Sequence, residues 1–240
     1  MKQTLLPALA ALLLPGSARA DTVRMGTEGA YPPYNFINDN GAVDGFEKDV
    51  GDMLCIRANL DCVWVINEWD SIIPNLVSGN YDTIIAGMSI TAERDEVIDF
   101  TQDYFPPSPS VYMGLSGSDI DLDGGVIAAQ TATIQAGYVA ESGATLVEFA
   151  SAEETISAVQ NGEADAVLAD GDYLLPIIAE SNGEFAAMGE VSIGGGVGMG
   201  IRESDGDLKA KMDKAISSMK DDGSLNALIK KWFGAEANTF

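Results

Sequence analysis

The sequence predicts an α/β fold of two lobes, in which the second lobe is inserted into the first and joined to it by two crossovers. Two observations lead to this expectation. Strand and helix patterns alternate along the chain, as in folds with a largely parallel sheet. A proline-rich segment (104–109) and a glycine-rich segment (194–200) interrupt the alternation and enclose a self-contained unit. Folds of this kind bind ligands in the crevice between the lobes, and the crossovers act as the hinge.

The first half of the chain alternates between strand and helix patterns. Residues Thr22–Thr27 alternate apolar and polar side chains, as a half-buried strand does, and 38–41 is a turn. The three prolines between 106 and 109 fit neither a helix nor a central strand, so we expect a crossover there. The other predicted elements are a helix from Phe46 to Cys55, a strand at Val63–Ile66, a helix at Ile72–Ser78 and a strand at Tyr81–Ala86.

The second half repeats the pattern. Its five glycines between 194 and 200 have neither the G-x-G-x-x-G spacing nor a helix directly after them, so a flexible crossover is favoured over a nucleotide site. Gly234 follows a helix that has two lysines in its last turn, which is typical of a helix end. The predicted elements are strands at Val126–Ala129, Thr145–Phe149 and Ala164–Leu168, and helices at Thr133–Glu141, Glu153–Gln160, Tyr173–Glu180, Asp207–Met219 and Ser224–Trp232.

Residues 1–20 have the pattern of a signal peptide. Lys2 precedes a ten-residue apolar run, which is too short to span a bilayer, and Ala18-Arg19-Ala20 fits the rule for cleavage after Ala20. We therefore expect a secreted protein without membrane insertion. The expected division is 1–20 for the signal peptide, 21–107 for the first part of lobe 1, 108–195 for lobe 2 and 196–240 for the return to lobe 1.

Composition excludes several classes of function. The first twenty residues hold two of the 13 basic residues and none of the 37 acidic ones, so a chain starting at Asp21 carries a net charge of −26, which repels nucleic acid and anionic lipid. The chain has no histidine, so Ser-His-Asp and Cys-His sites and His-ligated zinc are absent. The acidic segment 119–124 matches the first half of a calcium loop, but Gln130 stands where the bidentate glutamate is required. We expect neither a metal nor a cofactor.

The two cysteines, Cys55 and Cys62, lie close together in the sequence. A lone close pair in an oxidising compartment usually forms a disulfide. The C-x-x-C redox spacing is missing, so a structural bond is favoured over a catalytic one.

The segment Gly87 to Thr101 is the most informative part of the chain. It places small residues and two hydroxyls directly ahead of Arg94 at a predicted helix start. Free backbone N–H groups and the helix dipole favour an anion there, and a guanidinium grips both oxygens of a carboxylate. The alternative is a capped surface helix with a solvated arginine.

Three further residues lie beside turns or strand ends. Tyr31 and Trp69 are next to turn signals, where binding groups tend to be placed, although core or surface aromatics are the usual case. Asp170 follows an apolar strand and faces the mouth of the crevice if the lobe is wound as expected. The alternative for Asp170 is the N-cap of the next helix.

These motifs resemble those of the polar amino-acid periplasmic binding proteins that serve ABC importers (solute-binding protein family 3), especially the histidine and lysine/arginine/ornithine binders. The resemblance covers nearly all of the chain after residue 20. The matching segments are Gly26 to Tyr34, Gly45-Phe-Glu-Lys-Asp-Val, Trp69-Asp-Ser-Ile-Ile-Pro-Asn-Leu, Gly87-Met-Ser-Ile-Thr-Ala-Glu-Arg, Asp221-Asp-Gly-Ser and Lys231-Trp-Phe-Gly. The pair Cys55–Cys62 matches a disulfide of the histidine-type members.

The resemblance implies a role for each site residue. Arg94 binds the ligand α-carboxylate, helped by the backbone of Ser89 and Thr133. Asp170 takes the α-ammonium, helped by the Ser89 hydroxyl and the Gly87 carbonyl. Tyr31 and Trp69 flank the ligand side chain, and Glu28 stands where binders of basic ligands carry an aspartate. The chain departs from these relatives at Ala86, Gly87 and Ala132, which stand where the relatives have hydroxyl residues.

The resemblance implies a monomeric receptor for an amino acid, delivering it to an ABC permease. We expect a cationic ligand (arginine, lysine, ornithine or an opine), and glutamine stays open because an acid at position 28 also accepts from an amide. One alternative is a secreted enzyme of the cyclohexadienyl or arogenate dehydratase type, with Glu28 or Asp170 as the general acid. The other is a chemosensory receptor that uses the same pocket.

Overall fold

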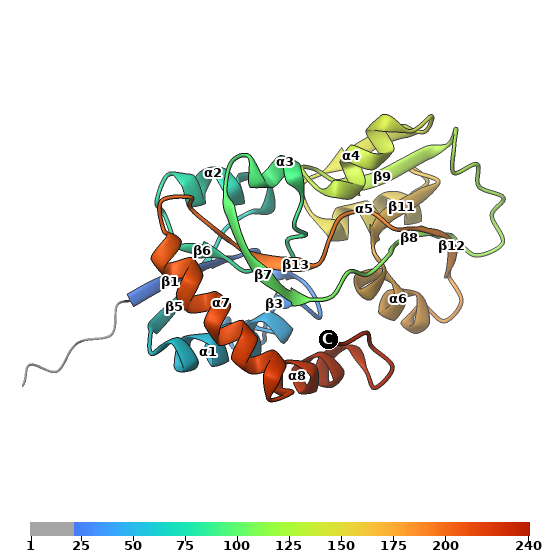
Figure 1. Cartoon of the computed structure of the whole chain (residues 1–240). Coiled ribbons are helices and arrows are strands. Elements are labelled where there is room, and N and C mark those ends of the chain that lie inside the picture. Colours follow the sequence, from blue (N-terminus) through green and yellow to red (C-terminus); the bar gives the residue numbers. More distant parts are fainter. Residues whose placement is uncertain (1–21) are drawn as a thin grey trace, which may run out of the picture.

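The structure, a computed structural model, describes residues 22–240 and has two lobes, each built on a five-stranded sheet (Figure 1). In each sheet one strand runs against the direction of the other four. The predicted α/β class and the two-lobed arrangement are therefore confirmed. The predicted signal peptide lies outside the described residues.

Lobe 1 holds both ends of the described chain, with helices on both faces of its sheet. The strand order is β5 (Asp61–Ile66), β1 (Thr22–Thr27), β6 (Thr83–Ile84), β13 (Val197–Ile201) and β7 (Asp99–Phe105). A small second sheet joins β2 (Ala30–Tyr31), β3 (Asn35–Ile37) and β4 (Val43–Asp44). The helices are α1 (Phe46–Ala58), a 3₁₀ turn (Trp69–Ser71), α2 (Ile72–Val77), α3 (Ala92–Asp95), α7 (Gly206–Asp221) and α8 (Ser224–Phe233).

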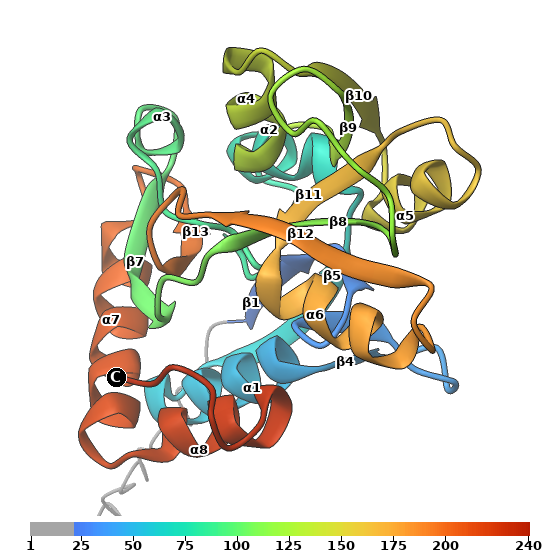
Figure 2. The same cartoon turned by 90° about the vertical axis from the view of Figure 1, so that its right-hand side faces the viewer.

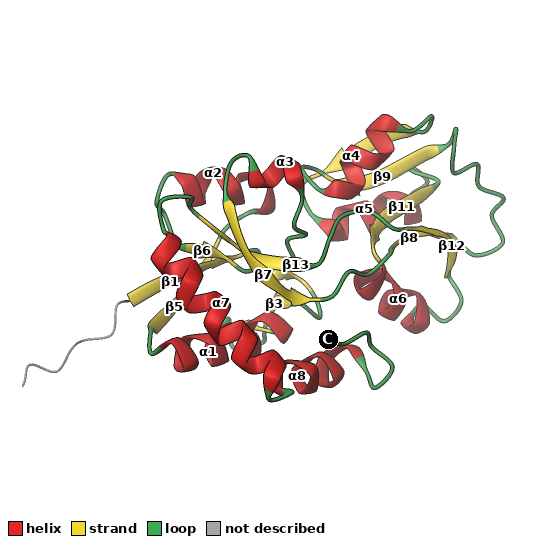
Figure 3. Ribbon diagram, viewed as in Figure 1, coloured by secondary structure: helices red, strands yellow, loops and turns green. Residues whose placement is uncertain are grey.

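Lobe 2 consists of the chain between β7 and β13. Its strand order is β10 (Thr145–Phe149), β9 (Val126–Gln130), β11 (Ala166–Asp170), β8 (Ser110–Leu115) and β12 (Phe185–Val191). Its helices are α4 (Ile134–Glu141), α5 (Ala152–Gln160) and α6 (Gly171–Glu180). Figure 3 shows helices packed around this sheet as well.

Local sequence explains most of these elements. Val23 and Met25 of β1 are buried, as the alternating pattern predicts. Asn59 ends α1 in the left-handed conformation that asparagine tolerates. The first turn of α5 is a capping box, in which Ser151 and Glu154 exchange side-chain-to-backbone hydrogen bonds.

Two short connections join the lobes (Figure 2). One covers residues 106–109, between β7 and β8, and the other covers residues 192–196, between β12 and β13. Phe105 pairs with Val197 at one end of the connections, and Ser110 pairs with Val191 at the other. The crossovers therefore run side by side, as a hinge between two rigid sheets requires. The lobe boundaries expected at 107/108 and 195/196 stay a prediction.

Part of the glycine-rich segment is a strand and not a loop, so that expectation is wrong for residues 197–200. The strand β13 is buried at every position and runs antiparallel between β6 and β7. A Cβ on Gly198 would lie 2.8 Å from Cδ1 of Ile90, and one on Gly200 would lie 2.9 Å from Cδ1 of Ile98. The glycines are there because neighbouring isoleucine side chains occupy the space that a side chain would need.

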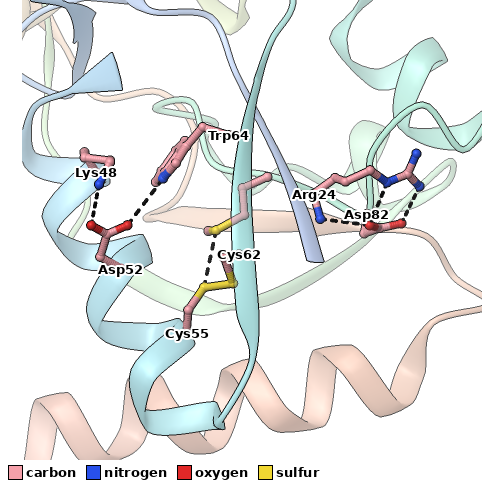
Figure 4. The surroundings of a disulfide bond; sticks show 8 residues. Arg24, Lys48, Asp52, Cys55, Cys62, Trp64 and Asp82 are labelled. Atoms are coloured by element: carbon pink, nitrogen blue, oxygen red, sulfur yellow. Dashed lines mark hydrogen bonds and ion pairs between the residues drawn. A yellow bond between two sulfur atoms is a disulfide. The ribbon is translucent and has the colours of Figure 1, made fainter. Parts of the chain in front are cut away.

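The predicted disulfide between Cys55 and Cys62 is present and ties the last turn of α1 to β5 (Figure 4). The Sδ atom of Met25 lies 3.5 Å from Cys55 Sγ, so the bond is packed against the core beneath β1. An ion pair between Arg24 and Asp82, with 2.7 Å between Nη2 and Oδ1, joins β1 to the segment before β6. Within residues 22–240, no helix has the length and apolar character needed to cross a membrane.

Candidate ligand site between the lobes

A cavity with about 480 Å³ of empty space, part of it open to solvent, lies between the lobes. Both lobes line it, and so do all eight residues that the sequence assigned to the site. These residues are Glu28, Tyr31, Trp69, Gly87, Ser89 and Arg94 from lobe 1, and Thr133 and Asp170 from lobe 2.

Arg94 lies in α3, where the Thr91 side chain caps the helix by accepting from the Arg94 amide at 3.2 Å. Its guanidinium donates to the carbonyl oxygen of Ser89 at 2.9 Å and, across the lobes, to that of Ala132 at 3.2 Å. The Trp69 ring lies 5.4 Å from the guanidinium carbon. Two of the five N–H groups are used in these bonds, and the other three can serve a ligand.

The dipole of the helix that carries Arg94 contributes less positive potential to the cavity than expected. The helix is only four residues long, so its dipole is small. The guanidinium itself therefore supplies the positive charge of the cavity. Burial lowers the pKa of Arg94 to about 10, and the carboxylate of Asp170 acts in the opposite direction. Arg94 thus remains charged at neutral pH.

Asp170 ends β11 and occupies the N-cap position of α6, but its side chain makes no capping hydrogen bond. Its carboxylate accepts instead from Tyr31 Oη at 2.9 Å and from Gln135 Nε2 at 2.9 Å. Burial raises its pKa, and the hydrogen bond from Tyr31 is the largest influence that lowers it. The expected N-cap position is therefore confirmed, but the side chain does not cap the helix, because both oxygens are directed to partners on other elements.

Tyr31 reaches from lobe 1 into lobe 2. Its ring stacks on Tyr173, with 4.2 Å between the ring centroids, while its hydroxyl donates to Asp170. Tyr34 makes a second bond of this kind, with 3.4 Å between its hydroxyl and Oδ2 of Asp172. These contacts, together with the Arg94–Ala132 bond, hold the two lobes against each other.

Glu28 lies at another part of the cavity wall and has a different environment. The carboxylate is buried, and its hydrogen bond comes from Gln130 Nε2 in lobe 2, at 2.7 Å. The pKa of Glu28 is raised to about 7, mainly by burial and also by the charges of Glu68 and Glu47, while the hydrogen bond from Gln130 opposes the rise. Within residues 22–240, no salt bridge to Glu28 is formed.

The remaining predicted residues shape the cavity through their backbone and small side chains. Gly87 has a φ of +63°, which favours glycine. Thr133 is the N-cap of α4, and its hydroxyl accepts from the Ala136 amide at 3.1 Å. Trp69 is buried, and its Nε1 has no hydrogen-bond partner among the described residues.

Sequence reasoning missed two glutamines of the cavity wall. Gln130 is the last residue of β9 and bonds Glu28, while Gln135 is in the first turn of α4 and bonds Asp170. Each partner is more than 30 residues away in the sequence, and a single glutamine has no local pattern. The position of Gln130 at the carboxyl end of a predicted strand was the one available signal.

The chain is similar to known amino-acid-binding proteins. The sequence pattern of the bacterial extracellular solute-binding proteins, family 3, matches residues 23–235. The chain is 31% identical to an L-arginine-binding protein of Pseudomonas aeruginosa, with 94% of this chain and 93% of that protein covered. It is 30% identical to an octopine-binding periplasmic protein of Rhizobium meliloti, with 97% of each covered.

Solved structures give the same relationship. A periplasmic His/Glu/Gln/Arg/opine family-binding protein from Silicibacter pomeroyi, in complex with lysine, is 71% identical to this chain, with a TM-score of 0.88. The alignment covers 91% of this chain and all of that one. An ancestral amino-acid-binding protein described as a precursor of cyclohexadienyl dehydratase is 26% identical, with a TM-score of 0.79 over 88% of this chain and 95% of that one.

Proposed function

Because the chain belongs to family 3 of the bacterial extracellular solute-binding proteins, we propose that it is a periplasmic receptor for an α-amino acid with a cationic side chain. The observation that carries this proposal is the set of charges in the cavity. Among the described residues of its wall, one cation, Arg94, and two carboxylates, Asp170 and Glu28, face the same space. A cationic amino acid carries the complementary set, with one carboxylate and two cations.

The roles follow from charge and position. Arg94 binds the α-carboxylate through its remaining N–H groups, and the backbone of Ser89 and Thr133 assists. Asp170 binds the α-ammonium, which the Ser89 hydroxyl and the Gly87 carbonyl also contact. Each charge-assisted hydrogen bond contributes about 1.5–3 kcal/mol, whereas a buried charge left without a partner costs more.

Glu28 meets the cation at the far end of the ligand side chain, and the Tyr31 and Trp69 rings flank its aliphatic part. Lysine, arginine and ornithine fit this description, and an opine such as octopine has the same distal cation with a second carboxylate in addition. The arginine- and octopine-binding relatives and the lysine complex of the 71% identical protein support the assignment.

Closure of the lobes explains how binding becomes a signal for transport. Arg94 belongs to lobe 1 and Asp170 to lobe 2, so a zwitterion between them bridges the lobes. A ligand favours the closed form only through such differential contacts. We propose that the closed, monomeric receptor then docks on the permease of an ABC importer in the inner membrane.

Isothermal titration calorimetry against lysine, arginine, ornithine, octopine, histidine, glutamine and glutamate tests the ligand class. The proposal predicts that at least one of the first four binds ten or more times more tightly than glutamine. Tighter binding of glutamine or glutamate than of all four cationic ligands would refute the side-chain assignment.

One observation favours a second function. The pKa of Glu28 near 7 is suitable for a general acid, and a dehydratase precursor has the same fold. Incubation of the pure protein with prephenate or arogenate, with detection of the aromatic product, tests this candidate. Turnover that disappears in Glu28→Gln would establish it, and absence of product at high enzyme concentration would exclude it for these substrates.

A further inference from the structure

Glu47 is a buried carboxylate with no place in the ligand site, although it touches the segments that form it. It lies in the first turn of α1, has no exposed surface and does not line the cavity. Its Oε1 accepts from the Gly87 amide at 2.6 Å and from the Tyr104 hydroxyl. Its Oε2 accepts from Asn35 Nδ2 at 2.6 Å.

Asn35 extends this set of hydrogen bonds to a second segment. Its Oδ1 accepts from the Gly29 amide at 2.7 Å, and its side chain is also fully buried. The Gly29 amide is a donor, so the Asn35 amide group has only one orientation, with Nδ2 directed to Glu47. The hydrogen bonds therefore run in a fixed direction from Gly29 through Asn35 to Glu47.

The two ends of this network are neighbours of ligand-facing groups. Gly29 directly follows Glu28, and Gly87 is itself part of the cavity wall and has a positive φ. Tyr104 belongs to β7, one residue before the end of the strand that leads into the crossover between the lobes. The Glu47 carboxylate thus links the Gly29 and Gly87 segments to each other and to β7, the strand that leads into the crossover.

We propose that Glu47, through Asn35, is a positioning residue that holds the Glu28 and Gly87 segments in the geometry needed for the ligand. The proposal rests on the amino-acid receptor function proposed above. A buried carboxylate with three donors suits this role because charge-assisted hydrogen bonds are short and directional. Burial raises the pKa of Glu47, and the three hydrogen bonds oppose that shift.

The test exploits the direction of the hydrogen bonds. Glu47→Gln places an NH₂ group against the NH₂ of Asn35, and Asn35→Asp places a carboxylate against that of Glu47. Each single substitution therefore breaks the network. The double variant Glu47→Gln/Asn35→Asp restores every pair. In it, the new carboxylate at position 35 accepts from the Gly29 amide and from the new side-chain NH₂ at position 47. The side-chain oxygen at position 47 still accepts from Gly87 and Tyr104.

The measured quantity is the Kd for lysine by calorimetry, with the thermal midpoint recorded for each variant. We expect each single substitution to weaken binding about tenfold or more and the double variant to recover to within about threefold of the wild-type protein. Thr83→Val is the matched control. It removes a buried hydrogen bond, 3.0 Å from Thr83 Oγ1 to the Gly200 carbonyl, away from the cavity, and should lower the thermal midpoint with the Kd unchanged within about twofold.

A Glu47→Gln variant that folds and binds lysine within about twofold of the wild-type protein would overturn the proposal, as would a folded double variant with no recovery. Amide hydrogen exchange of the wild-type protein tests the network even if the single variants do not fold. The Gly29 and Gly87 amides should be protected as strongly as those of β1, and exchange at the rate of an exposed loop contradicts the proposal. Failure of the wild-type protein to bind any basic amino acid would refute the receptor function instead.

Discussion

Two regions of the cavity wall differ in how their charges are supported. In one region Arg94 of lobe 1 and Asp170 of lobe 2 interact electrostatically, and Asp170 accepts from both Tyr31 and Gln135. In the other, Glu28 is buried with a single amide donor, Gln130, and carboxylates are the charges that shift its pKa. Under the proposed function, Arg94 and Asp170 form the shared end, which binds the part common to all α-amino acids, and Glu28 forms the selecting end, which binds the ligand side chain.

The largest effect is expected from the shared end. Arg94→Ala removes the only cationic side chain among the described residues of the cavity wall and leaves the ligand carboxylate without its partner. We expect the affinity for lysine and for glutamine to fall together by about 100- to 1,000-fold, measured by calorimetry. A loss confined to one of the two ligands would show that Arg94 contacts the ligand side chain, and would contradict its assignment to the shared end.

The selecting end should discriminate between ligands. Glu28→Gln keeps the shape of the side chain and removes its charge. Lysine should bind about 10- to 100-fold more weakly, because its distal ammonium loses an ionic partner, whereas the affinity for glutamine should change by less than about threefold. Equal losses for both ligands contradict the assignment of Glu28 to the ligand side chain.

The pH dependence follows from the same carboxyl group. With a pKa of about 7, Glu28 is mostly protonated at pH 6 and mostly ionised at pH 8, so lysine should bind about tenfold more tightly at pH 8. The raised pKa also means that the contribution of Glu28 to the free energy of unfolding of the ligand-free protein decreases as pH rises from about 4.5 to 7. Titrations of lysine in matched buffers check the first effect, and a flat profile between pH 6 and 8 in the wild-type protein would contradict it.

Glu28→Gln is the control for this measurement. Its affinity for lysine should not change between pH 6 and 8. A persistent slope in that variant would assign the proton to another buried carboxyl group, such as Asp170, whose pKa burial also raises.

The smallest effect is expected at Asp170, whose carboxylate accepts from both Tyr31 and Gln135 and keeps one donor when the other is removed. Tyr31→Phe removes the hydrogen bond to Asp170 and retains the stack on Tyr173, so lysine and glutamine should both bind about fivefold more weakly. Tyr34→Phe is the comparison variant, because Tyr34 does not line the cavity and its bond to Asp172 is long, at 3.4 Å. Equal losses from both substitutions would mean that the hydroxyls act on lobe closure and not on Asp170.

Local sequence patterns were sufficient to predict much of the fold. The strands Thr22–Thr27 and Thr145–Phe149 have the predicted bounds, because alternation and turn signals delimit them. Strands β8 and β12 lie in segments for which no element was predicted, and β13 lies in a segment expected to be a crossover. Strand β8 is buried at five of its six positions and so lacks alternation. In β13 the glycines leave space for side chains of residues that are distant in the sequence.

In the candidate site, too, local patterns predicted some residues, whereas contacts between distant residues could not be predicted. The motif around Arg94 and the position of Asp170 at a strand end were enough to predict both charged residues, and both line the cavity. The contacts of Gln130, Gln135 and Glu47 depend on partners in other elements, so no window of sequence contains them. Asp170 also shows that an N-cap position does not imply a capping side chain, because its oxygens are directed to Tyr31 and Gln135.

A crystal structure of the lysine complex tests the central claim most directly. The account predicts that the α-carboxylate contacts the Arg94 guanidinium, that the α-ammonium contacts Asp170, and that Nζ lies within hydrogen-bond distance of Glu28. A lysine bound in the opposite direction, or one whose Nζ points to solvent while Glu28 keeps only its bond from Gln130, would contradict the account.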